Sequence, residues 1–529
     1  MDMTALSVDV VGRRNLRNLL TERVDRQPDK PYLVFEGRNG DVQEFTYSEF
    51  LRNVQRAAAG FAGLGIGKGD AVVIHLPNCP EFLFSWFGLT WIGAVAVPAN
   101  AANTATEMEH VLGHSEAVAV VVSADHWEVI DRAVQGAPTV KHRVLARTTT
   151  AMGEAVLFTD FLAADAEPPV VEVDSEDVAQ MIFTSGTTSR PKAVMLTHAN
   201  CLRSGERASR SAAADDQDRF LTALPAFHVN AQSMTIMASL TVGGTCILLE
   251  EYRASIFWSQ LIRHRATSVS LVAMQVRTLL AQPPRDEDRQ HHLRRNFYAI
   301  NVLDSEKEEF ERRYGVELVN GYGLSEAMTI VTVAPVFGEK RWPSIGLPAY
   351  DRIVRIVDER GEDVPLGSPG EIIVWGIPGR TLMKGYFKDP DATAAALRDG
   401  WLYTGDNGYF DERGYVYFFD RKKDVIKRSG ENISASEVEV ALLTHEGVAE
   451  AAVIGVPDPI RDEAVKAFVV AREGVDLTVD EVLRHCREHL AGFKVPTVVE
   501  IIDGLPKTSI GKIEKKVLRQ WSAESGAGS

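Results

Sequence analysis

Cysteine and long apolar runs are scarce in this sequence, and basic residues are fewer than acidic ones. The 529 residues include four scattered cysteines, Cys79, Cys201, Cys246 and Cys486, without the paired spacing of a zinc framework. This usage fits reduced, buried thiols, and a catalytic cysteine is the alternative that stays open. No apolar run reaches transmembrane length, and the first thirty residues alternate charged and apolar side chains, unlike a signal peptide. We therefore expect a cytoplasmic protein with no membrane insertion.

Acidic residues outnumber basic ones. Asp and Glu total 73 against 57 Lys and Arg, so the formal net charge is −16. This balance argues against nucleic acid or an anionic membrane as a partner, and local basic groups must hold any nucleotide. Hydrophobic residues make up 45% and charged residues 25%, which is typical of a soluble globular protein. A chain of 529 residues exceeds what one core usually supports, so we expect at least two domains.

Two common catalytic signatures and internal repeats are missing. The chain has neither a GxxxxGK[ST] phosphate loop nor a GxSxG nucleophile elbow. The glycine-rich run 63–69 follows a predicted helix, capped by the box Thr46-Tyr-Ser-Glu49, and precedes a strand, which reverses the Rossmann order. Further predicted elements indicate an α/β protein with a layered parallel sheet: strand 71–75, a helix near 80–91, strands 94–97 and 117–122, and a linker at 164–177.

The stretch from Met181 to His198, MIFTSGTTSRPKAVMLTH, carries the clearest chemical pattern. Two apolar runs flank a segment rich in hydroxyls and glycine, which predicts a strand, a phosphate-binding loop and a second strand. Gly186 permits a tight turn in which amides and hydroxyls converge on anionic oxygens, and Lys192 adds a positive charge. A Ser/Thr-rich surface turn is the alternative for this loop taken alone.

This stretch resembles the TSGTTGxPKGV loop of the adenylate-forming enzymes, which include acyl-CoA synthetases, adenylation domains and firefly luciferases. Ser189 and Ala193 replace two glycines of that pattern. Four further segments resemble family motifs in the same order: Asn320-Gly-Tyr-Gly-Leu-Ser-Glu326, Trp401-Leu-Tyr-Thr-Gly-Asp406, Lys427-Arg-Ser-Gly-Glu-Asn-Ile433 and Leu505-Pro-Lys-Thr-Ser-Ile-Gly-Lys512. Asp420-Arg-Lys-Lys-Asp424 resembles the hinge between the family's two domains. The resemblance covers about residues 20 to 520.

The resemblance implies a role for each matching residue. The ATP site would comprise Thr184, Ser185, Gly186, Thr187, Thr188, Lys192, Gly321, Tyr322, Gly323, Ser325, Asp406, Arg421 and Lys512. Glu326 and Thr184 would hold Mg²⁺, and the catalytic set would be Lys512, Glu326, His228 and Thr184. The CoA tunnel would be lined by Lys427, Ser429, Gly430 and Glu431, and Lys423 would be the hinge pivot. Only its position in the motif distinguishes Lys512 from the neighbouring surface lysines, Lys515 and Lys516.

The acyl pocket follows the family order less closely. The resemblance places Phe227, His228 and Val229 at this pocket, together with Ala299, Ile300 and Asn301. The segment 297–303 departs from the glycine-rich turn of most relatives, which puts its adenine and acyl contacts in doubt. Ser305 and Glu308 are predicted to form a capping box before a helix over 307–314. A packed structural histidine is the alternative for His228.

The fold implied is α/β, with a large N-terminal domain of layered β-sheets flanked by helices and a small, mobile α+β C-terminal domain. The expected boundaries are 1–420, a hinge at 421–424, and 425–529. The reaction implied uses ATP, Mg²⁺ and CoA to convert a carboxylic acid to acyl-AMP and then to acyl-CoA. The closest branch resembles carnitine/crotonobetaine-CoA ligases, although the lining favours a hydrophobic or polycyclic acid.

Several alternatives stay open at this stage. The enzyme could load a carrier protein or perform a single half-reaction. It could also bind nucleotide without catalysis, although all the charged motif residues are retained. A homodimer is a further open question.

Overall fold

A computed structural model of the chain describes residues 9–184, 191–299, 302–421, 424–428, 431–458, 462–507 and 513–526. The chain divides into two compact units. The first unit comprises Met1–Val354 and Val374–Tyr403, and the second comprises Arg355–Ile373 and Thr404–Ser529. None of the helices in the described part of the chain is long and apolar enough to span a membrane. The prediction that residues 421–424 form a hinge stays a prediction.

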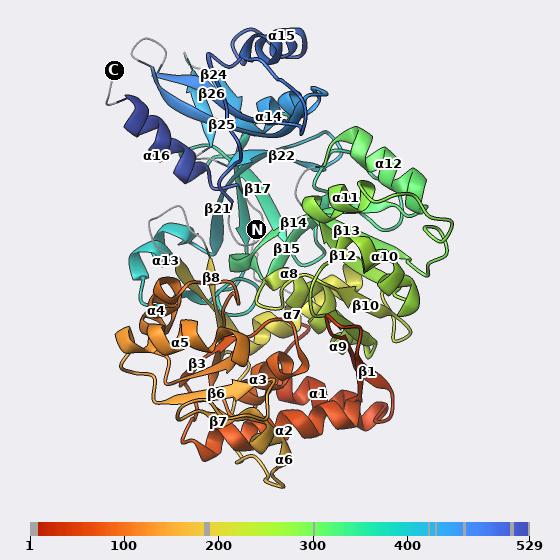
Figure 1. Ribbon diagram of the computed structural model, residues 1–529, viewed down its shortest axis with the longest axis vertical. Coiled ribbons are helices and arrows are strands. Elements are labelled where there is room, and N and C mark those ends of the chain that lie inside the picture. Colours follow the sequence, from red (N-terminus) through yellow and green to blue (C-terminus); the bar gives the residue numbers. More distant parts are fainter. Residues whose placement is uncertain are drawn as a thin grey trace. The chain divides into compact units, whose positions relative to one another are not determined.

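The first unit contains two large sheets. The nine-stranded sheet has the order β16 (Leu347–Pro348), β15 (Thr329–Val333), β14 (Leu318–Leu324), β13 (Arg295–Ala299), β12 (Ser268–Val272), β10 (Arg219–Thr222), β11 (Thr245–Leu249), β1 (Pro31–Glu36) and β2 (Val42–Thr46). The eight-stranded sheet has the order β19 (Gly385–Tyr386), β9 (Lys192–Thr197), β8 (Val178–Thr184), β4 (Val95–Pro98), β3 (Ala71–His75), β5 (Ala119–Ser123), β6 (His142–Ala146) and β7 (Val156–Leu157). Figure 1 labels several of these strands, among them β3 and β8 of the eight-stranded sheet and β12, β13 and β14 of the nine-stranded sheet.

Helices cover both faces of each sheet, which gives five layers. The middle layer includes α2 (Tyr47–Gly63), α3 (Pro80–Trp91) and α7 (His198–Ser211), whose apolar side chains share one core with both sheets. The outer face of the eight-stranded sheet packs on α4 (Ala105–His114) and α5 (Trp127–Ala133). The outer face of the nine-stranded sheet packs on α10 (Ala254–Arg263), α11 (Ala273–Leu280) and α12 (Asp304–Tyr314).

The strand sequences explain this layering. In β3, Val72 and Ile74 belong to the middle core, whereas Val73 belongs to the outer core under α4 and α5. Successive side chains of a strand point to opposite faces, so a strand covered on both sides must be apolar throughout. This unit also contains the helices α1 (Leu16–Arg26), α6 (Phe158–Ala163), α8 (Val229–Ala231), the π-helix η4 (Gln232–Met237), α9 (Ala238–Val242) and α13 (Pro390–Ala396).

Most local predictions for this unit are confirmed. The box predicted at Thr46 and Glu49 caps α2, the predicted helix Pro80–Trp91 is α3, and all four cysteines are buried and unpaired. The predicted box at Ser305 and Glu308 is wrong. The helix α12 begins at Asp304, and the carboxylate of Glu306 accepts a hydrogen bond from the Leu303 amide. The capping acid therefore lies two residues earlier than predicted.

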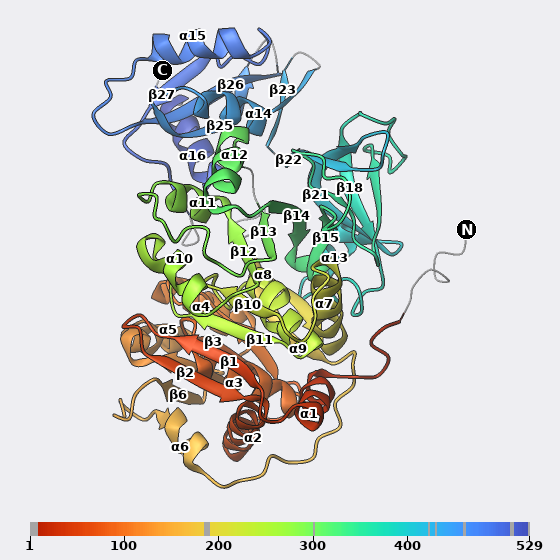
Figure 2. The same cartoon turned by 90° about the vertical axis from the view of Figure 1, so that its right-hand side faces the viewer.

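The second unit contains two smaller sheets. One sheet has the order β17 (Ile353–Val357), β18 (Gly370–Trp375), β21 (Trp401–Phe410) and β20 (Leu397–Arg398), with β22 (Val416–Arg421) paired to β21. Most residues of β17, β18 and β21 belong to the second unit, whereas β20 belongs to the first. The other has the order β24 (Glu431–Ser434), β23 (Val425–Arg428), β26 (Asp462–Ala471) and β25 (Val448–Asp458), with β27 (Val498–Ile501) paired to β26. Its helices are α14 (Ala435–Leu443), α15 (Val479–His489) and α16 (Lys515–Gly526). Figure 2 labels β18, β21 and β22 of one sheet and β23, β25, β26 and β27 of the other.

A buried network of charged residues fixes the backbone that follows β14. Arg207 of α7 donates two hydrogen bonds to the Asp351 carboxylate and one to the Met328 carbonyl. Arg352 donates to the Ala327 carbonyl, so two guanidinium groups hold consecutive peptide units. Arg207 and Arg352 are both nearly inaccessible to solvent. The network thereby anchors the turn η5 (Ser325–Ala327) to the middle helix layer.

Replacing Asp351 tests this network. Asp351→Asn leaves Arg203 and Arg207 without their shared carboxylate, and breaking a buried pair in this way costs about 3 to 5 kcal/mol. Thermal or denaturant unfolding should report the loss. Asp131→Asn, which removes the exposed partner of Arg143, is the matched control and should cost no more than about 1 kcal/mol. Equal stability of the two variants would contradict the anchoring role.

The same network predicts a pH dependence. Burial raises the pKa of Asp351, but the adjacent Arg207 outweighs it, so the folded-state pKa lies well below the usual range. The carboxylate therefore contributes its stability above its unfolded pKa of about 3.9 and loses it as the pH falls through that value towards the folded pKa. The difference in free energy of unfolding between the wild type and Asp351→Asn should therefore become smaller below about pH 4.

Candidate functional site

The strands β8 and β9 form the antiparallel hairpin predicted around the hydroxyl-rich loop. Thr184, the last residue of β8, pairs directly with Lys192, the first residue of β9. The neighbouring Ile182 and Ala193 are buried in the cores on either side of the sheet. Residues Ser185, Gly186, Thr187 and Thr188, which were predicted to bind ATP, lie outside the described residues. The hairpin therefore presents a hydroxyl and an ammonium group at the two ends of the loop.

The turn that carries Glu326 depends on a close approach of two backbones. Gly323 of β14 pairs with Ile330 of β15, and a Cβ atom at Gly323 would lie 2.0 Å from the Thr329 carbonyl oxygen. Only glycine fits at that distance. The turn ends at Met328, whose φ of 35° is left-handed and costly for a side-chain-bearing residue. Its anchored carbonyl holds this conformation, and Glu326 is placed by that constraint.

Tyr386 connects this turn to the hairpin, and no sequence pattern singled it out. Its hydroxyl donates a hydrogen bond to Glu326 Oε1 at 2.9 Å. The ammonium nitrogen of Lys192 lies 5.0 Å from the centroid of the Tyr386 ring. Burial and the nearby Glu326 carboxylate raise the pKa of Tyr386, so it stays protonated and acts as the donor. Tyr386 lies on the two-residue strand β19, too short for any periodicity to identify it.

The donor set fits a metal ion carried by a nucleotide. Within the described residues, no three or more His, Cys, Asp or Glu side chains come together as a metal site. Mg²⁺ keeps several water ligands and usually takes one or two carboxylates together with substrate phosphates. Glu326 supplies one such carboxylate, and Thr184 supplies a hydroxyl. These oxygen donors suit Mg²⁺ bound through phosphates, and they do not form an all-protein cage.

Buried amide side chains hold the loop that precedes His228. Asn78 accepts a hydrogen bond from the Ala226 amide at 2.8 Å and donates one to the Leu224 carbonyl at 3.0 Å. Gln232 donates to the Ala226 carbonyl at 3.0 Å. The rings of Phe227 and His228 follow this clamped segment, with their centroids 4.4 Å apart. The loop therefore presents two half-buried rings, followed by the half-buried Val229.

The second predicted acyl segment is described only in part. Ala299 ends β13 and is half-buried, and Ile300 and Asn301 lie outside the described residues. Asp304, the acidic residue nearest this segment in sequence, accepts a hydrogen bond from Trp342 Nε1 at 2.5 Å. The rings of Trp342 and the buried Tyr298 lie 6.0 Å apart. The Asp304 carboxylate is therefore already engaged by an indole.

The second unit places Asp406 and Arg421 on neighbouring strands. The two residues are paired across β21 and β22, and Arg421 Nε lies 3.5 Å from Asp406 Oδ1. The Gly405 amide donates to Glu371, and the Asp406 amide donates to the Thr404 hydroxyl at 3.1 Å. These bonds fix the backbone of the Thr-Gly-Asp turn. Asp406 is mostly buried, whereas 49% of the Arg421 side chain is exposed.

The remaining predicted residues are described incompletely. Lys423, Ser429, Gly430 and Lys512 lie outside the described residues, as do the side chains of Lys427 and Glu431. Lys515 is not the surface lysine expected from the sequence. Its ammonium group lies 2.7 Å from Glu439, and its side chain is only 15% exposed. Lys516 is exposed. Burial therefore distinguishes Lys515 from Lys516, and their positions in the sequence did not reveal this difference.

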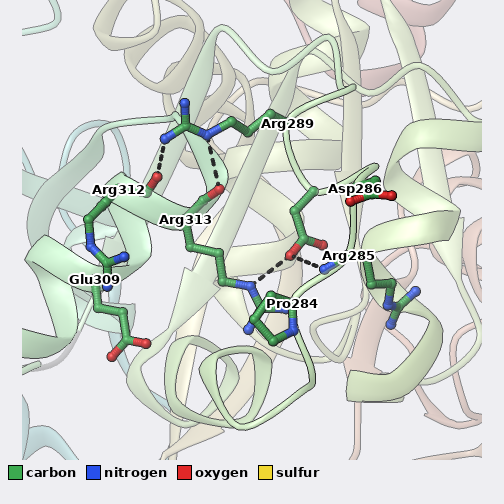
Figure 3. A pocket seen from close by; sticks show the side chains of 8 residues that line it. Pro284, Arg285, Asp286, Arg289, Glu309, Arg312 and Arg313 are labelled. Carbon is green, nitrogen blue, oxygen red and sulfur yellow. Dashed lines mark hydrogen bonds and ion pairs between the residues drawn. The ribbon is translucent and has the colours of Figure 1, made fainter.

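A surface cavity of about 290 Å³ lies apart from these residues and is lined by four arginines and three acids, with Pro284 (Figure 3). Three of its arginines, Arg285, Arg289 and Arg313, have structural partners. Arg313 pairs with Asp288 at 2.7 Å, and Arg289 donates to the Arg312 and Arg313 carbonyls at the end of α12. Such bonds satisfy the carbonyl groups that a helix leaves open at its C-terminus. This cluster fastens the loop after α11 to α12.

Comparisons with known proteins match almost the whole chain. Residues 20–387 match the AMP-binding enzyme family, and residues 437–512 match the AMP-binding enzyme C-terminal domain. A crotonobetaine/carnitine–CoA ligase from Salmonella arizonae is 41% identical over 519 residues, covering 97% of this chain and 100% of that protein. The ATP-bound structure of MatB from Rhodopseudomonas palustris is 28% identical, with a TM-score of 0.85, and covers 96% of this chain and 99% of that one.

A further structure shows the fold alone. The anthranilate CoA ligase AuaEII in complex with anthranoyl-AMP is 24% identical, with a TM-score of 0.88, and covers 97% of this chain and 98% of that one. These matches confirm the family resemblance and the closest branch predicted from the motifs. The matched range 20–387 contains the β8–β9 hairpin, the Glu326 turn and Tyr386. The chain belongs to the AMP-binding enzyme family.

Proposed function

We propose that this protein activates a carboxylic acid with ATP and transfers the acyl group to CoA. Membership of the family and the CoA-ligase relatives make it an AMP-forming acid–thiol ligase that uses ATP, Mg²⁺ and CoA. The acid attacks the α-phosphate of ATP, pyrophosphate leaves, and the CoA thiol then displaces AMP from the acyl-AMP. One observation carries the proposal. Tyr386 contacts both Glu326 and Lys192, and so connects the Glu326 turn to the β8–β9 hairpin.

Each group near the hairpin has a role in the first step. Lys192 and the hydroxyl of Thr184 bind phosphate oxygens at the ends of the loop, and Glu326 orients the Mg²⁺ that ATP brings. A metal ion held there would supply neutralisation of the charge that develops on the phosphates. Tyr322 offers a flat face to the adenine, and Ser325 donates to the α-phosphate. Lys512 stabilises the charge that rises on the α-phosphate during attack. His228 donates to the carboxylate of the acid.

The second unit serves both steps. Asp406 accepts hydrogen bonds from the ribose hydroxyls, and Arg421 contacts ribose or phosphate. We propose that 1–420 and 425–529 act as separate domains and that rotation about Lys423 within 421–424 withdraws Lys512 after adenylation. The segment from Lys427 to Glu431 then lines the path of the CoA thiol. A rotation of this kind lets one site perform two reactions in sequence.

We propose that the acid is hydrophobic or polycyclic. The described acyl segments contribute Phe227, Val229 and Ala299, which suit the burial of hydrocarbon at about 25 cal/mol per Å². The acidic residue nearest these segments in sequence is Asp304. Its carboxylate already accepts a hydrogen bond from the Trp342 indole, so it is a poor partner for a cationic substrate. A quaternary ammonium acid is the second candidate, because the crotonobetaine/carnitine ligase is 41% identical and Trp342 with Tyr298 offers aromatic faces beside a carboxylate.

We propose a cytoplasmic location, where ATP and CoA are supplied and where the four buried cysteines stay reduced. The partners are the small-molecule acid, ATP and CoA, with no role for nucleic acid. A homodimer is part of the proposal and is tested by light scattering of the purified protein.

One pair of assays tests the proposed function and the acid together. Acid-dependent exchange of pyrophosphate into ATP reports adenylation, and CoA thioester formation reports the second step. A panel of apolar, polycyclic and quaternary ammonium acids should support both, with an apolar acid faster than carnitine or crotonobetaine. Carnitine outpacing every apolar acid would contradict the hydrophobic proposal and favour the second candidate. Exchange without thioester formation would identify a carrier-loading or single-step enzyme.

Lys512→Ala should slow adenylation by about 10²- to 10³-fold, because one preorganised charge-stabilising donor is lost. Thioester formation from supplied acyl-AMP should change little, since Lys512 no longer acts in that step. Lys516→Ala, four residues along at an exposed position, is the matched control and should leave both rates unchanged. An equal loss of both half-reactions in Lys512→Ala would show that the assignment is wrong.

Glu326→Gln should raise the Mg²⁺ concentration needed for exchange and lower turnover, because an amide oxygen is a poorer ligand for a hard dication. Asp406→Ala should instead raise KM for ATP with little effect on kcat, since ribose contacts are the same in the ground and transition states. Mg²⁺ and ATP titrations of both variants check the two roles. A Glu326→Gln titration that overlays the wild type would assign the metal to another residue.

A further inference from the structure

Tyr386 contacts two functional groups of opposite charge with two parts of one side chain. Its hydroxyl donates to Glu326 Oε1 at 2.9 Å, and its ring lies 5.0 Å from the Lys192 ammonium nitrogen. Glu326 follows β14 of the nine-stranded sheet, whereas Lys192 begins β9 of the eight-stranded sheet. The tyrosine therefore links the two sheets of the first unit at the point where each presents its charged residue.

The backbone around Tyr386 is fixed on both sides. The Met383 amide donates to the Glu326 carbonyl at 2.7 Å, which attaches the start of this segment to the Glu326 turn. The amides of Lys384 and Phe387 donate to the Met195 and Ala193 carbonyls, at 2.9 and 2.8 Å, which attaches it to β9. The segment thus spans from the turn to the hairpin by backbone bonds alone, and the tyrosine side chain has a defined origin.

The two side-chain contacts have different physical consequences. A hydrogen bond to an ionised carboxylate is stronger than one between neutral groups, and it fixes the rotation of the Glu326 carboxylate. The bond is made to Oε1, one of the two oxygens of the Glu326 carboxylate. The ring attracts the Lys192 ammonium through its face and offers it no lone pair, so the ammonium keeps its three donor hydrogens. A neutral side chain in this way orients an anion and a cation without neutralising either.

We propose that Tyr386 is a positioning residue that orients Glu326 towards the metal ion of the nucleotide and Lys192 towards its phosphates. This inference rests on the proposed function and assigns a role that no motif of the sequence carries. The hydroxyl and the ring act separately, the first on the metal ligand and the second on the phosphate-binding lysine. A residue that only filled space would be replaced by phenylalanine without consequence, since Phe differs from Tyr by one hydroxyl.

Tyr386→Phe isolates the hydroxyl. Losing a group that orients a metal ligand typically weakens metal affinity by 10- to 100-fold, so we expect at least a roughly tenfold weaker affinity for Mn²⁺. The measurement is Mn²⁺ binding by electron paramagnetic resonance in the presence of a non-hydrolysable ATP analogue. The Mg²⁺ concentration needed for half-maximal pyrophosphate exchange should rise by the same factor. Tyr252→Phe, which removes a hydroxyl bonded to the Gln275 carbonyl and to Thr278 in the same unit, is the matched control and should change neither value.

Tyr386→Leu removes the ring as well. This variant should show the same loss of Mn²⁺ affinity as Tyr386→Phe and, in addition, weaker binding of the ATP analogue measured without metal. Metal-free affinity equal to that of Tyr386→Phe would overturn the role of the ring. Unchanged Mn²⁺ affinity in folded Tyr386→Phe would overturn the role of the hydroxyl.

A double-mutant cycle separates positioning from general damage to the fold. In the Glu326→Gln background, Tyr386→Phe should have little further effect on Mn²⁺ affinity, because the ligand that it orients is already changed. The same loss in both backgrounds would overturn the proposal. These binding measurements do not require turnover. If no acid supports exchange in the wild type, the proposed function fails while the role of Tyr386 in metal and nucleotide binding is still decided.

Discussion

The hydrogen bond between Tyr386 and Glu326, with the backbone bond from Met383 to the Glu326 carbonyl, is the interaction on which the candidate site depends. Glu326 follows β14 of the nine-stranded sheet, and the β8–β9 hairpin belongs to the eight-stranded sheet. Each sheet packs against cores on both faces, and the segment 383–387 connects the Glu326 turn to β9 by backbone hydrogen bonds. This connection adds to the buried network of Arg207 and Arg352, which holds the same turn from the middle helix layer.

The protein stabilises this connection with features that are costly in isolation. Gly323 allows the backbones of β14 and β15 to approach more closely than any side chain permits. Met328 adopts a left-handed conformation, and buried guanidinium groups of Arg207 and Arg352 hold the carbonyls on either side of the turn's end. Buried charges are weak evidence for stability in general. Here their hydrogen bonds converge on the turn that carries Glu326, which gives them a positional role.

The sequence predicted the fold class, the hairpin and the order of the functional segments, because these depend on local patterns. The alternation of apolar runs with helices and the glycine-bearing loop at 184–192 are visible without tertiary information. Tyr386 was missed because β19 has two residues and derives its place entirely from β9 and the Glu326 turn. The burial of Lys515 was missed because its partner, Glu439, lies on a different helix. Contacts between distant segments are what pattern reading cannot supply.

The capping box of α12 was also predicted wrongly, by two residues. The predicted box was Ser305 with Glu308, and the chain uses Leu303 with Glu306, two residues closer to β13. Substrate identity is a similar case, since the acyl lining that we propose combines the end of β13 with the His228 loop, which are far apart in the sequence.

The most direct test of the account follows oxygen atoms through the reaction. An acid labelled with ¹⁸O in its carboxylate is incubated with the enzyme, ATP, Mg²⁺ and CoA, and the products are analysed by mass spectrometry. The carboxylate oxygen that attacks the α-phosphate stays on phosphorus when the thiol displaces AMP. The account predicts one ¹⁸O atom in AMP and none in pyrophosphate. Label in inorganic phosphate, with ADP as the nucleotide product, would contradict it.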